Sequence, residues 1–349
     1  MNPGDRIESD VRAIALPAGR RVGQPGHDIA REYLRGRLEE IGLEPLRGDS
    51  FELPFEREGT RFTNLVGVIP GSNRNLPPVL VGAHYDSVID APCADDNATS
   101  VAVALAAAET FAREPLQRDV VIAIFDSEEP PYFLSPSMGS TRFYEDHCAD
   151  VRFKCVLIMD LIGHDVELGL GSVEDAFPYL KDLIFVTGAE SDPGRLPGCV
   201  QRASYSMGNE LRVIPTLTSY VGDLSDYHAF RLGGEPYLFL SCGRGPYYHH
   251  VLDSLKTPGW INLDKVHRVF QLVVELLREA DACGPDAVDE SNESAVAPDT
   301  LEFEIRLLEQ ALEGLLPALL GPLGLEEIQS REDFNRLASV LGRVLVDQG

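Results

Sequence analysis

The stretch VVIAIFDSEEP, residues 120–130, joins an unbroken apolar run to a pair of acids, Glu128 and Glu129. Such a run is typical of a strand that is buried on both faces, as in the sheet of an α/β protein. Apolar runs that end in polar side chains recur in PPVLVGAH (77–84) and CVLIMD (155–160). Side chains at the ends of such strands converge on one crevice. We therefore expect these groups to lie together.

Helical patterns alternate with these strand-like runs. Apolar residues recur at helical spacing in 26–43, where Gly42 is a typical helix stop. The alanine-rich stretch 99–111 is almost entirely apolar, as expected of a buried helix that packs on a sheet, and 264–282 is a further helix. We predict an α/β fold, namely a three-layer αβα sandwich with a mixed, mostly parallel central sheet, plus a C-terminal helical appendage.

Composition divides the chain into three parts. Residues 1–283 form the main domain, 284–298 have the composition of a linker, and 299–349 form the helical appendage. Within the appendage, Ser330 and Asp333 resemble a helix-capping pair. We expect the appendage to be a helical cap, a packed C-terminal arm or a homodimer element, and to carry none of the chemistry.

Length and charge limit the partners. The chain has 349 residues, 44% of them hydrophobic, and a formal net charge of −26, which argues against nucleic acid and anionic membranes as partners. No apolar run is long enough to span a bilayer. Six cysteines are scattered without CxxC spacing, which favours reduced thiols. Since the start does not resemble a signal peptide, we expect a cytoplasmic protein, or a secreted one if a leader has been removed.

Two pairs of candidate site residues precede the Glu128–Glu129 pair. His84 could bind a metal while Asp86 orients its ring, although this pair alone is more often a core histidine bonded to a neighbouring acid. Asp95 and Asp96 stand at the entry to a helix, where an acid can serve as a metal ligand, as an N-cap, or as both. These residues alone leave both readings open.

The strongest signal is the Glu128–Glu129 pair. Two carboxylates directly after a buried strand would repel one another and be costly to desolvate without a cation. Asp160 and the doublet His249–His250 add further ligands of the types that hold Zn²⁺. We interpret the chain as a metal-dependent hydrolase, with Glu128 as the candidate base.

Beyond these residues, whole segments resemble the family-28 zinc metallopeptidases. The resemblance runs from about residue 10 to residue 282 and rests on segments that occur in the family's order: VGAHYDSV, APCADDNATSVA, FDSEEPPYFLSPSMGS, LIMDLIG, SDYHAF and YYHHVLDS. That family includes bacterial and fungal aminopeptidases and, more distantly, glutaminyl cyclases. Two ions of zinc are therefore expected, with Mn²⁺ or Co²⁺ possible at the same ligands.

The resemblance implies which residues hold the metals. One ion would be bound by His84 and Asp160, and the other by Glu129 and His249. Asp96 would bridge the two ions.

Four more acids have expected roles. The resemblance implies that Glu128 is the general acid/base, and Asp86, which would orient the first histidine, is counted with Glu128 among the catalytic residues. Asp226 and Asp253 are candidates for supporting the ligands from behind. Asp253 stands four residues after His249, as in the family motif, and so selects that histidine rather than the next one.

The sequence departs from the family at three places. Cys93 stands where the family usually has glycine, Tyr227 separates Asp226 from His228, and an insertion occupies about 130–137. None of these departures removes a ligand. The insertion falls where the rim of the substrate pocket is expected, so it bears on specificity.

The activity implied is that of an aminopeptidase. Zinc-bound hydroxide would hydrolyse peptides with a free N-terminus, and Glu128 would carry the proton. The alternatives are a glutaminyl cyclase, which uses one zinc ion, and a non-catalytic binding module on the same scaffold. The binding module predicts eroded ligands, whereas all the ligands are present here.

Overall fold

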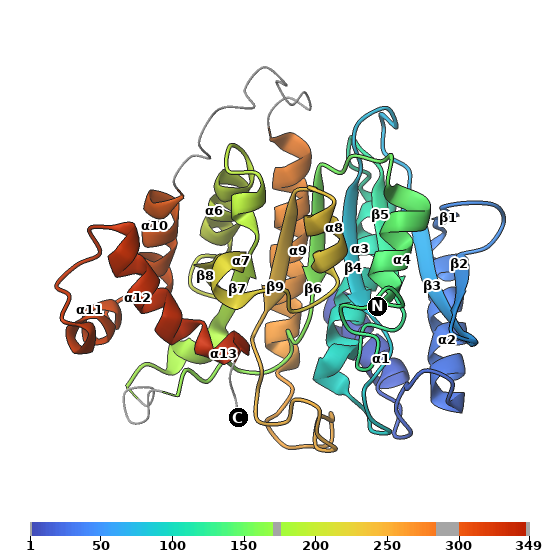
Figure 1. Cartoon of the computed structure of the whole chain (residues 1–349), viewed down its shortest axis with the longest axis horizontal. Helices are drawn as coiled ribbons and strands as arrows, with labels where there is room; N and C mark the ends of the chain where they lie inside the picture. The colour runs from blue at the N-terminus through green and yellow to red at the C-terminus, as the bar shows by residue number, and fades with distance from the viewer. Residues whose placement is uncertain (1, 170–175, 284–299, 347–349) are drawn as a thin grey trace.

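The computed structural model describes residues 2–169, 176–283 and 300–346. Its framework is a nine-stranded sheet (Figure 1). The strands are β1 (Glu44–Pro45), β2 (Glu52–Arg57), β3 (Thr60–Ile69), β4 (Val79–His84), β5 (Val120–Phe125), β6 (Cys155–Met159), β7 (Leu183–Thr187), β8 (Arg212–Thr216) and β9 (Tyr237–Ser241). Their order is β1-β3-β5-β4-β6-β9-β7-β8, and β2 pairs with β3.

The centre of this sheet is parallel and its flanks are antiparallel. Strands β5, β4, β6 and β9 run parallel to one another, whereas β3 and β7 join them in the antiparallel sense. Successive residues of β4 enter different cores, since Val79 and Val81 lie under one face and Leu80 under the other. Burial on both faces explains the continuous apolar run. The predicted α/β fold with a mixed sheet is confirmed.

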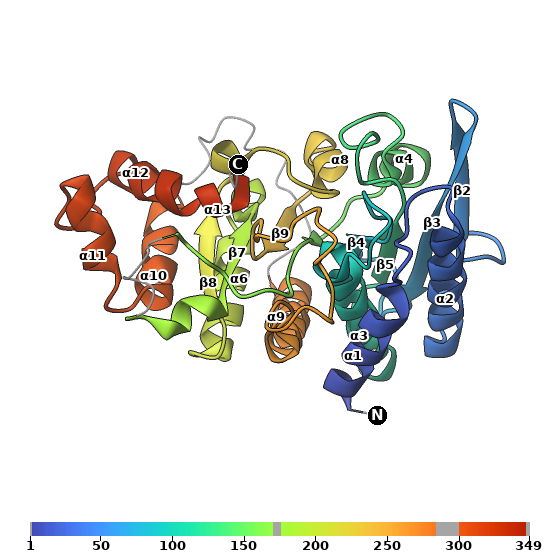
Figure 2. The same cartoon turned by 90° about the horizontal axis from the view of Figure 1, so that it is seen from below.

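Helices cover both faces of the sheet (Figure 2). The larger layer contains α1 (Pro3–Ile14), α2 (Pro25–Ile41), α3 (Thr99–Arg113), α6 (Leu196–Met207) and α9 (Leu263–Ala282). The opposite face carries α4 (Gly139–Phe143) and α8 (Tyr227–Leu232). Short helical turns lie in the connections: η1 (Ala94–Ala98), η2 (Tyr144–Cys148), η3 (Pro178–Asp182), η4 (Ala189–Ser191) and α7 (Thr218–Val221).

Two predicted helices show how the sequence sets their ends and packing. Helix α2 stops at Gly42, whose φ of 85° lies in the left-handed region that glycine adopts readily. Helix α3 is buried along almost its whole length, because its alanines let the backbone lie close to the sheet. Among the described helices, none has the length and apolar character needed to cross a bilayer.

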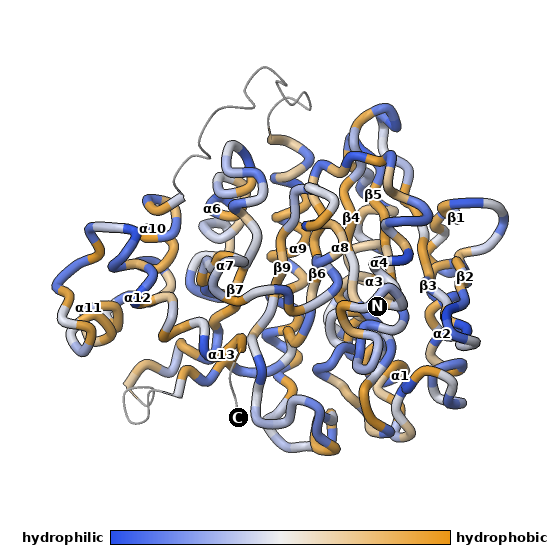
Figure 3. The backbone as a smooth tube through the Cα atoms, viewed as in Figure 1, coloured by the Kyte–Doolittle hydropathy of each residue, from blue (hydrophilic) through white to orange (hydrophobic). Residues whose placement is uncertain are grey.

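The C-terminal appendage packs against one edge of the sheet. Its helices are α10 (Leu301–Ala311), α11 (Leu316–Leu320), η6 (Gly321–Leu323), α12 (Arg331–Leu341) and α13 (Arg343–Val346). Figure 3 shows apolar and hydrophilic residues alternating along these helices. Leu308, Leu312 and Phe334 share one buried cluster with Phe185 of β7 and Ile214 of β8. The appendage thus shares a hydrophobic core with the sheet. The predicted linker 284–298 lies outside the described residues.

The capping pair of the appendage has the expected contacts. The Ser330 hydroxyl accepts a hydrogen bond from the Asp333 backbone N–H at 3.2 Å and donates one to its carboxylate at 2.7 Å. This satisfies a donor at the start of α12 that the helix itself leaves unpaired.

Removing one large side chain from the shared cluster should destabilise the whole protein. Phe334 is fully buried, so Phe334→Ala is expected to cost about 3–5 kcal/mol of unfolding free energy. Thermal unfolding and metal content of the purified variant test this, and metal content should not change. Leu232→Ala, at a residue that is 65% exposed, is the control and should change stability by less than about 0.5 kcal/mol. Equal melting of the two variants would contradict the shared core.

Candidate metal centre

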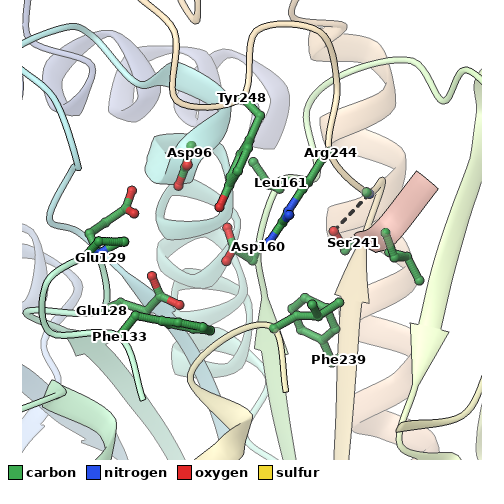
Figure 4. A pocket seen from close by; sticks show the side chains of 14 residues that line it. Asp96, Glu128, Glu129, Phe133, Asp160, Leu161, Phe239, Ser241, Arg244 and Tyr248 are labelled. Carbon is green, nitrogen blue, oxygen red and sulfur yellow. Dashed lines mark hydrogen bonds between the residues drawn. The ribbon is translucent and has the colours of Figure 1, made fainter. Parts of the chain in front are cut away.

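The candidate ligands gather at one end of the central strands (Figure 4). His84 is the last residue of β4, and Asp160 directly follows β6. The Glu128–Glu129 pair follows β5. Strand ends that point the same way bring these side chains together, as the sequence predicted. Asp96 from η1 and His249 from the loop after β9 complete the group.

Asp96 lies between the two histidines. Its Oδ1 is 3.4 Å from His84 Nε2, and its Oδ2 is 3.4 Å from His249 Nε2. His84 Nε2 is also 3.6 Å from an oxygen of Asp160, and His249 Nε2 is 3.1 Å from Glu129 Oε2. Each histidine therefore faces one further acid and one oxygen of the shared acid.

Several of these ligand atoms are buried without a hydrogen-bond partner in the described part of the chain. They are both ring nitrogens of His84, Nε2 of His249, Oε1 of Glu129 and Oδ1 of Asp160. A buried polar atom without a partner costs free energy. A cation coordinated by Nε2 of each histidine and by the carboxylate oxygens would remove that cost at these atoms, whereas His84 Nδ1 faces Asp86. The donor set of imidazole nitrogens and carboxylate oxygens fits zinc.

Distance alone leaves one ligand assignment open. Two overlapping groups could hold an ion: His84 with Asp96 and Glu129, and His84 with Glu128 and Asp160. Glu128 Oε2 lies 3.8 Å from His84 Nε2, slightly farther than the Asp96 and Asp160 oxygens. The division of ligands between two ions, and the role of Glu128, stay predictions.

Asp86 holds the acidic pair in place. Its Oδ1 accepts a hydrogen bond from the Glu128 backbone N–H at 3.0 Å, and its Oδ2 accepts one from that of Glu129 at 3.1 Å. The same Oδ1 is 3.4 Å from His84 Nδ1. Asp86 thus fixes the backbone of the acidic pair and lies beside the His84 ring.

Asp253 holds the backbone at Asp95 and Asp96 in a similar way. Its oxygens accept hydrogen bonds from the backbone N–H groups of Asp95 and Asp96 at 2.8 and 3.0 Å, and from Trp260 Nε1 at 2.7 Å. The Asp95 side chain is occupied elsewhere, because it accepts from the Gly163 N–H at 2.6 Å and pairs with His164. Of these two acids, Asp96 is the one that faces His84 and His249.

Asp226 lies in the wall behind the site. It is fully buried, and neither of its carboxylate oxygens has a hydrogen-bond partner among the described residues. Burial raises its pKa to about 7, and the nearby charges of Asp86 and Asp160 add to this, although His84 acts in the opposite direction. The adjacent Tyr227 and His228 are used structurally, since the tyrosine accepts from Leu224 N–H and the histidine pairs with Asp223.

Left-handed backbone conformations surround the site. Cys93, Ser127, Leu161 and His249 have φ values of 44°, 50°, 55° and 54°. Non-glycine residues rarely adopt such values, and strained residues of this kind cluster at functional sites. The value at Cys93 is one that glycine adopts without strain, so it explains why the family usually has glycine there but not why this chain has cysteine.

Arg20 is a site residue that the sequence did not reveal. It is fully buried, and its guanidinium donates hydrogen bonds to backbone carbonyls of the loops that carry the ligands: Tyr85 at 2.7 Å, Pro92 at 2.6 Å, Cys93 at 2.9 Å and Asp96 at 3.2 Å. An arginine more than 60 positions before its partners has no local pattern that announces this contact.

The pKa values at the site reflect an excess of carboxylates over positively charged groups. Burial raises the pKa of Glu129 to about 8, helped by the charge of Asp96 and opposed by the histidines. Burial also holds the pKa of Glu128 well above its ordinary range, with Asp160 and Asp226 adding to the shift. The pKa of His249 rises to about 10 because its contacts with Asp96 and Glu129 outweigh burial. A bound cation would stabilise the ionised form of these carboxylates.

Zinc binding to the metal-free protein should therefore release protons at pH 7. With a pKa of about 8, Glu129 is largely protonated at that pH, whereas a ligand carboxylate must be ionised. Affinity should rise as the pH increases toward 8. Calorimetric titration with zinc in two buffers of different ionisation enthalpy measures the protons released.

The same shift sets the sign of a stability change. The unfolded Glu129 has an ordinary pKa of 4.5, so between that value and about 8 the folded, metal-free protein binds more protons than the unfolded chain. Its unfolding free energy should then fall as the pH rises through this window. The zinc-loaded protein should lack this fall. Proton-independent zinc binding at pH 7 would contradict both expectations.

The side chains beside the ligands form a cavity of about 150 Å³. Pro130 and Phe133 of the insertion line it, as do Tyr248, Arg244 and, from the appendage, Leu345. The insertion therefore reaches the cavity, as its position in the sequence predicted. The contributions of Arg244 and Leu345 were not predicted.

A known family model matches more than half of the chain. Residues 64–276 match the model of peptidase family M28. The uncharacterized protein YfbL of Escherichia coli (strain K12) is 34% identical over 165 residues, which cover 40% of this chain and 50% of that protein. The chain thus spans about half the length of this curated relative.

Solved structures share the fold at low identity. A Zn-dependent exopeptidase from Parabacteroides distasonis is 16% identical with a TM-score of 0.61, covering 79% of this chain and 97% of that one. Glutaminyl cyclase from Porphyromonas gingivalis is 18% identical with a TM-score of 0.62, covering 79% and 98%. At such identities the likeness shows the fold alone.

Proposed function

The chain belongs to peptidase family M28, and on this premise we propose that it is a zinc-dependent aminopeptidase with two ions in its site. The observation that carries the proposal is the position of Asp96, whose two oxygens lie between His84 and His249. Two imidazoles on opposite sides of one carboxylate favour a pair of ions that share it. The substrate would be a peptide with a free N-terminus.

The residues around the ligands suit hydrolysis. Bound zinc supplies Lewis acidity, which lowers the pKa of water and polarises a carbonyl group. Glu128 would take the proton from the attacking water and deliver it to the leaving amine. Its backbone N–H is fixed by Asp86, so its carboxylate is held at one place. The surrounding acids would attract the positively charged N-terminus of a peptide.

Tyr248 offers a donor for the developing oxyanion. It lines the cavity, and Figure 4 shows its hydroxyl directed between Asp96 and Asp160. Burial, together with the charges of Asp96 and Glu129, raises the tyrosine pKa, so the hydroxyl keeps its proton at neutral pH. A fixed O–H at this position would stabilise negative charge on the carbonyl oxygen.

The rival activity is that of a glutaminyl cyclase with a single zinc ion. Metal analysis of the purified protein, together with a panel of aminoacyl-p-nitroanilides and an N-terminal glutaminyl peptide, separates the two. Two ions with release of p-nitroaniline support the aminopeptidase. One ion with cyclisation of the glutaminyl peptide would overturn it.

A further inference from the structure

Arg244 stands out among the side chains that line the cavity beside the metal ligands. Most of the other lining residues outside the ligand group are apolar: Pro130, Phe133, Leu161, Leu224, Phe239 and Leu345. A cavity of about 150 Å³ accepts a group of roughly the size of benzene, that is, one side chain. Figure 4 shows the arginine running into this space past Tyr248 toward Asp160.

The end of the appendage fixes this arginine. Its backbone N–H donates to the carbonyl oxygen of Val344 at 2.8 Å, and its Nη1 donates to that of Val346 at 3.1 Å. Its guanidinium carbon lies 4.9 Å from the ring centroid of Tyr248, a cation–π contact. A side chain held on these sides loses little further freedom when it binds a ligand.

Arg244 differs from most arginines of the chain in having no acidic partner among the described residues. In a chain with 56 acidic and 30 basic residues, most arginines find a carboxylate, yet no described acid forms an ion pair with Arg244. Guanidinium has five N–H donors in a fork that matches a carboxylate. Since Val346 takes only one of them, the rest can bind an anionic group that enters the cavity.

Resting on the proposed function, we propose that Arg244 binds a carboxylate of the substrate and that the enzyme prefers peptides that carry one beside the scissile bond. Two groups share this chemistry: the side chain of an acidic N-terminal residue, and the C-terminal carboxylate of a dipeptide. The acids of the site would repel either group elsewhere in the cavity, so the arginine sets where it binds. Arg244 is then a specificity-determining residue.

Close approach of the appendage makes this arrangement possible. Gly243 has a φ of 85°, and a Cβ atom there would lie 2.5 Å from the Val344 carbonyl oxygen. Only glycine lets α13 approach near enough to hold Arg244 and to place Leu345 in the cavity wall. The appendage therefore shapes the substrate pocket while it supplies no metal ligand.

Matched substrates test the proposal. One arm compares glutamyl- with glutaminyl-p-nitroanilide, and the other compares the dipeptide leucyl-glycine with its amide. In at least one arm, wild-type kcat/KM should favour the acid by about 10–100-fold, as expected of hydrogen bonds between charged groups. Arg244→Met should remove that preference, so that the ratio of kcat/KM between the acidic and the neutral substrate falls to about one. The arm that responds identifies which carboxylate is bound.

Controls separate specificity from folding. Arg113→Met replaces an arginine that is 71% exposed and should keep the wild-type preference. Arg244→Lys should retain part of the preference, because it keeps the charge and loses the fork. Melting temperature and zinc content show whether each variant is intact. If Arg244→Met does not fold, Gly243→Ala displaces the segment that holds the arginine and should reduce the same preference.

The outcomes also separate this proposal from the aminopeptidase assignment. Hydrolysis of neutral substrates with no preference for acids, or with equal losses on both members of a pair in Arg244→Met, overturns the role of Arg244 and leaves the aminopeptidase intact. If the zinc-loaded wild type hydrolyses none of the substrates, the aminopeptidase fails. Calorimetric binding of both matched pairs then decides the arginine's role, and equal affinities within both pairs overturn it.

Discussion

Replacing Glu128 with glutamine is expected to lower kcat by about 10²–10⁴-fold, the range that general acid–base groups supply. The amide has nearly the shape of the carboxylate but cannot accept the proton of water. Its backbone N–H would still donate to Asp86, so the Glu129 ligand beside it should stay in place. Turnover of an aminoacyl-p-nitroanilide and metal analysis by mass spectrometry measure the two effects.

Metal content decides between base and ligand. By distance, Glu128 could also join His84 and Asp160 around an ion. If Glu128 is a base, the Glu128→Gln variant should bind two ions. If Glu128 is a ligand, the variant should lose one of them. Glu129→Gln serves as the ligand control and should lose metal as well as activity. Near-normal turnover in Glu128→Gln would show that Glu128 is not the general acid/base.

The central half of the fold could be predicted because its strands have a clear local sequence pattern. The runs that became β4, β5 and β6 are continuously apolar and end in polar residues. Strands β7 and β8 were missed. In β8 the apolar pattern is interrupted by Arg212 and Pro215, and proline is unusual within a strand. Here Arg212 donates from Nη1 to two carbonyls of α10 and lies over the ring of Tyr179, contacts that no local pattern predicts.

Because β7 and β8 were not predicted, the position of the appendage could not be predicted either. Without a sheet edge to cover, the helices after residue 299 looked separate from the main domain. Their apolar faces in fact complete a core whose other half comes from β7 and β8. The composition of 284–298 marked a boundary in sequence, but packing depends on which surfaces meet in space.

At the site, the sequence predicted the ligand types better than their supports. His84, Glu128, Glu129 and Asp160 follow apolar runs, so their convergence could be inferred from strand geometry. Arg20 donates to distant backbone carbonyls, and the end of α13 offers its own carbonyl of Val344 to the N–H of Arg244. Such contacts depend on tertiary structure and leave no periodic or spacing signal.

The choice of His249 over His250 rests on the family motif, in which an acid stands four residues after the histidine. It predicts opposite results for two neighbouring variants. His249 Nε2 is 3.1 Å from Glu129 Oε2 and has no hydrogen-bond partner among the described residues. The exposed His250 uses its Nδ1 to accept the Leu252 N–H at 3.1 Å. His249→Ala should therefore lose one metal ion and all measurable hydrolysis, whereas His250→Ala should keep both ions and change at most the substrate preference.

The backbone at His249 calls for a second variant. Its φ of 54° is left-handed, so alanine there changes the local conformational preference as well as removing the imidazole. Asparagine tolerates this conformation better than most residues, and His249→Asn thus keeps the loop while replacing the ligand by a weaker one. Loss of one ion in both His249 variants assigns the effect to coordination, since strain alone would spare the asparagine variant. A metal-depleted His250→Ala beside a fully loaded His249→Ala would exchange the two roles, because the ion would then depend on the neighbouring ring.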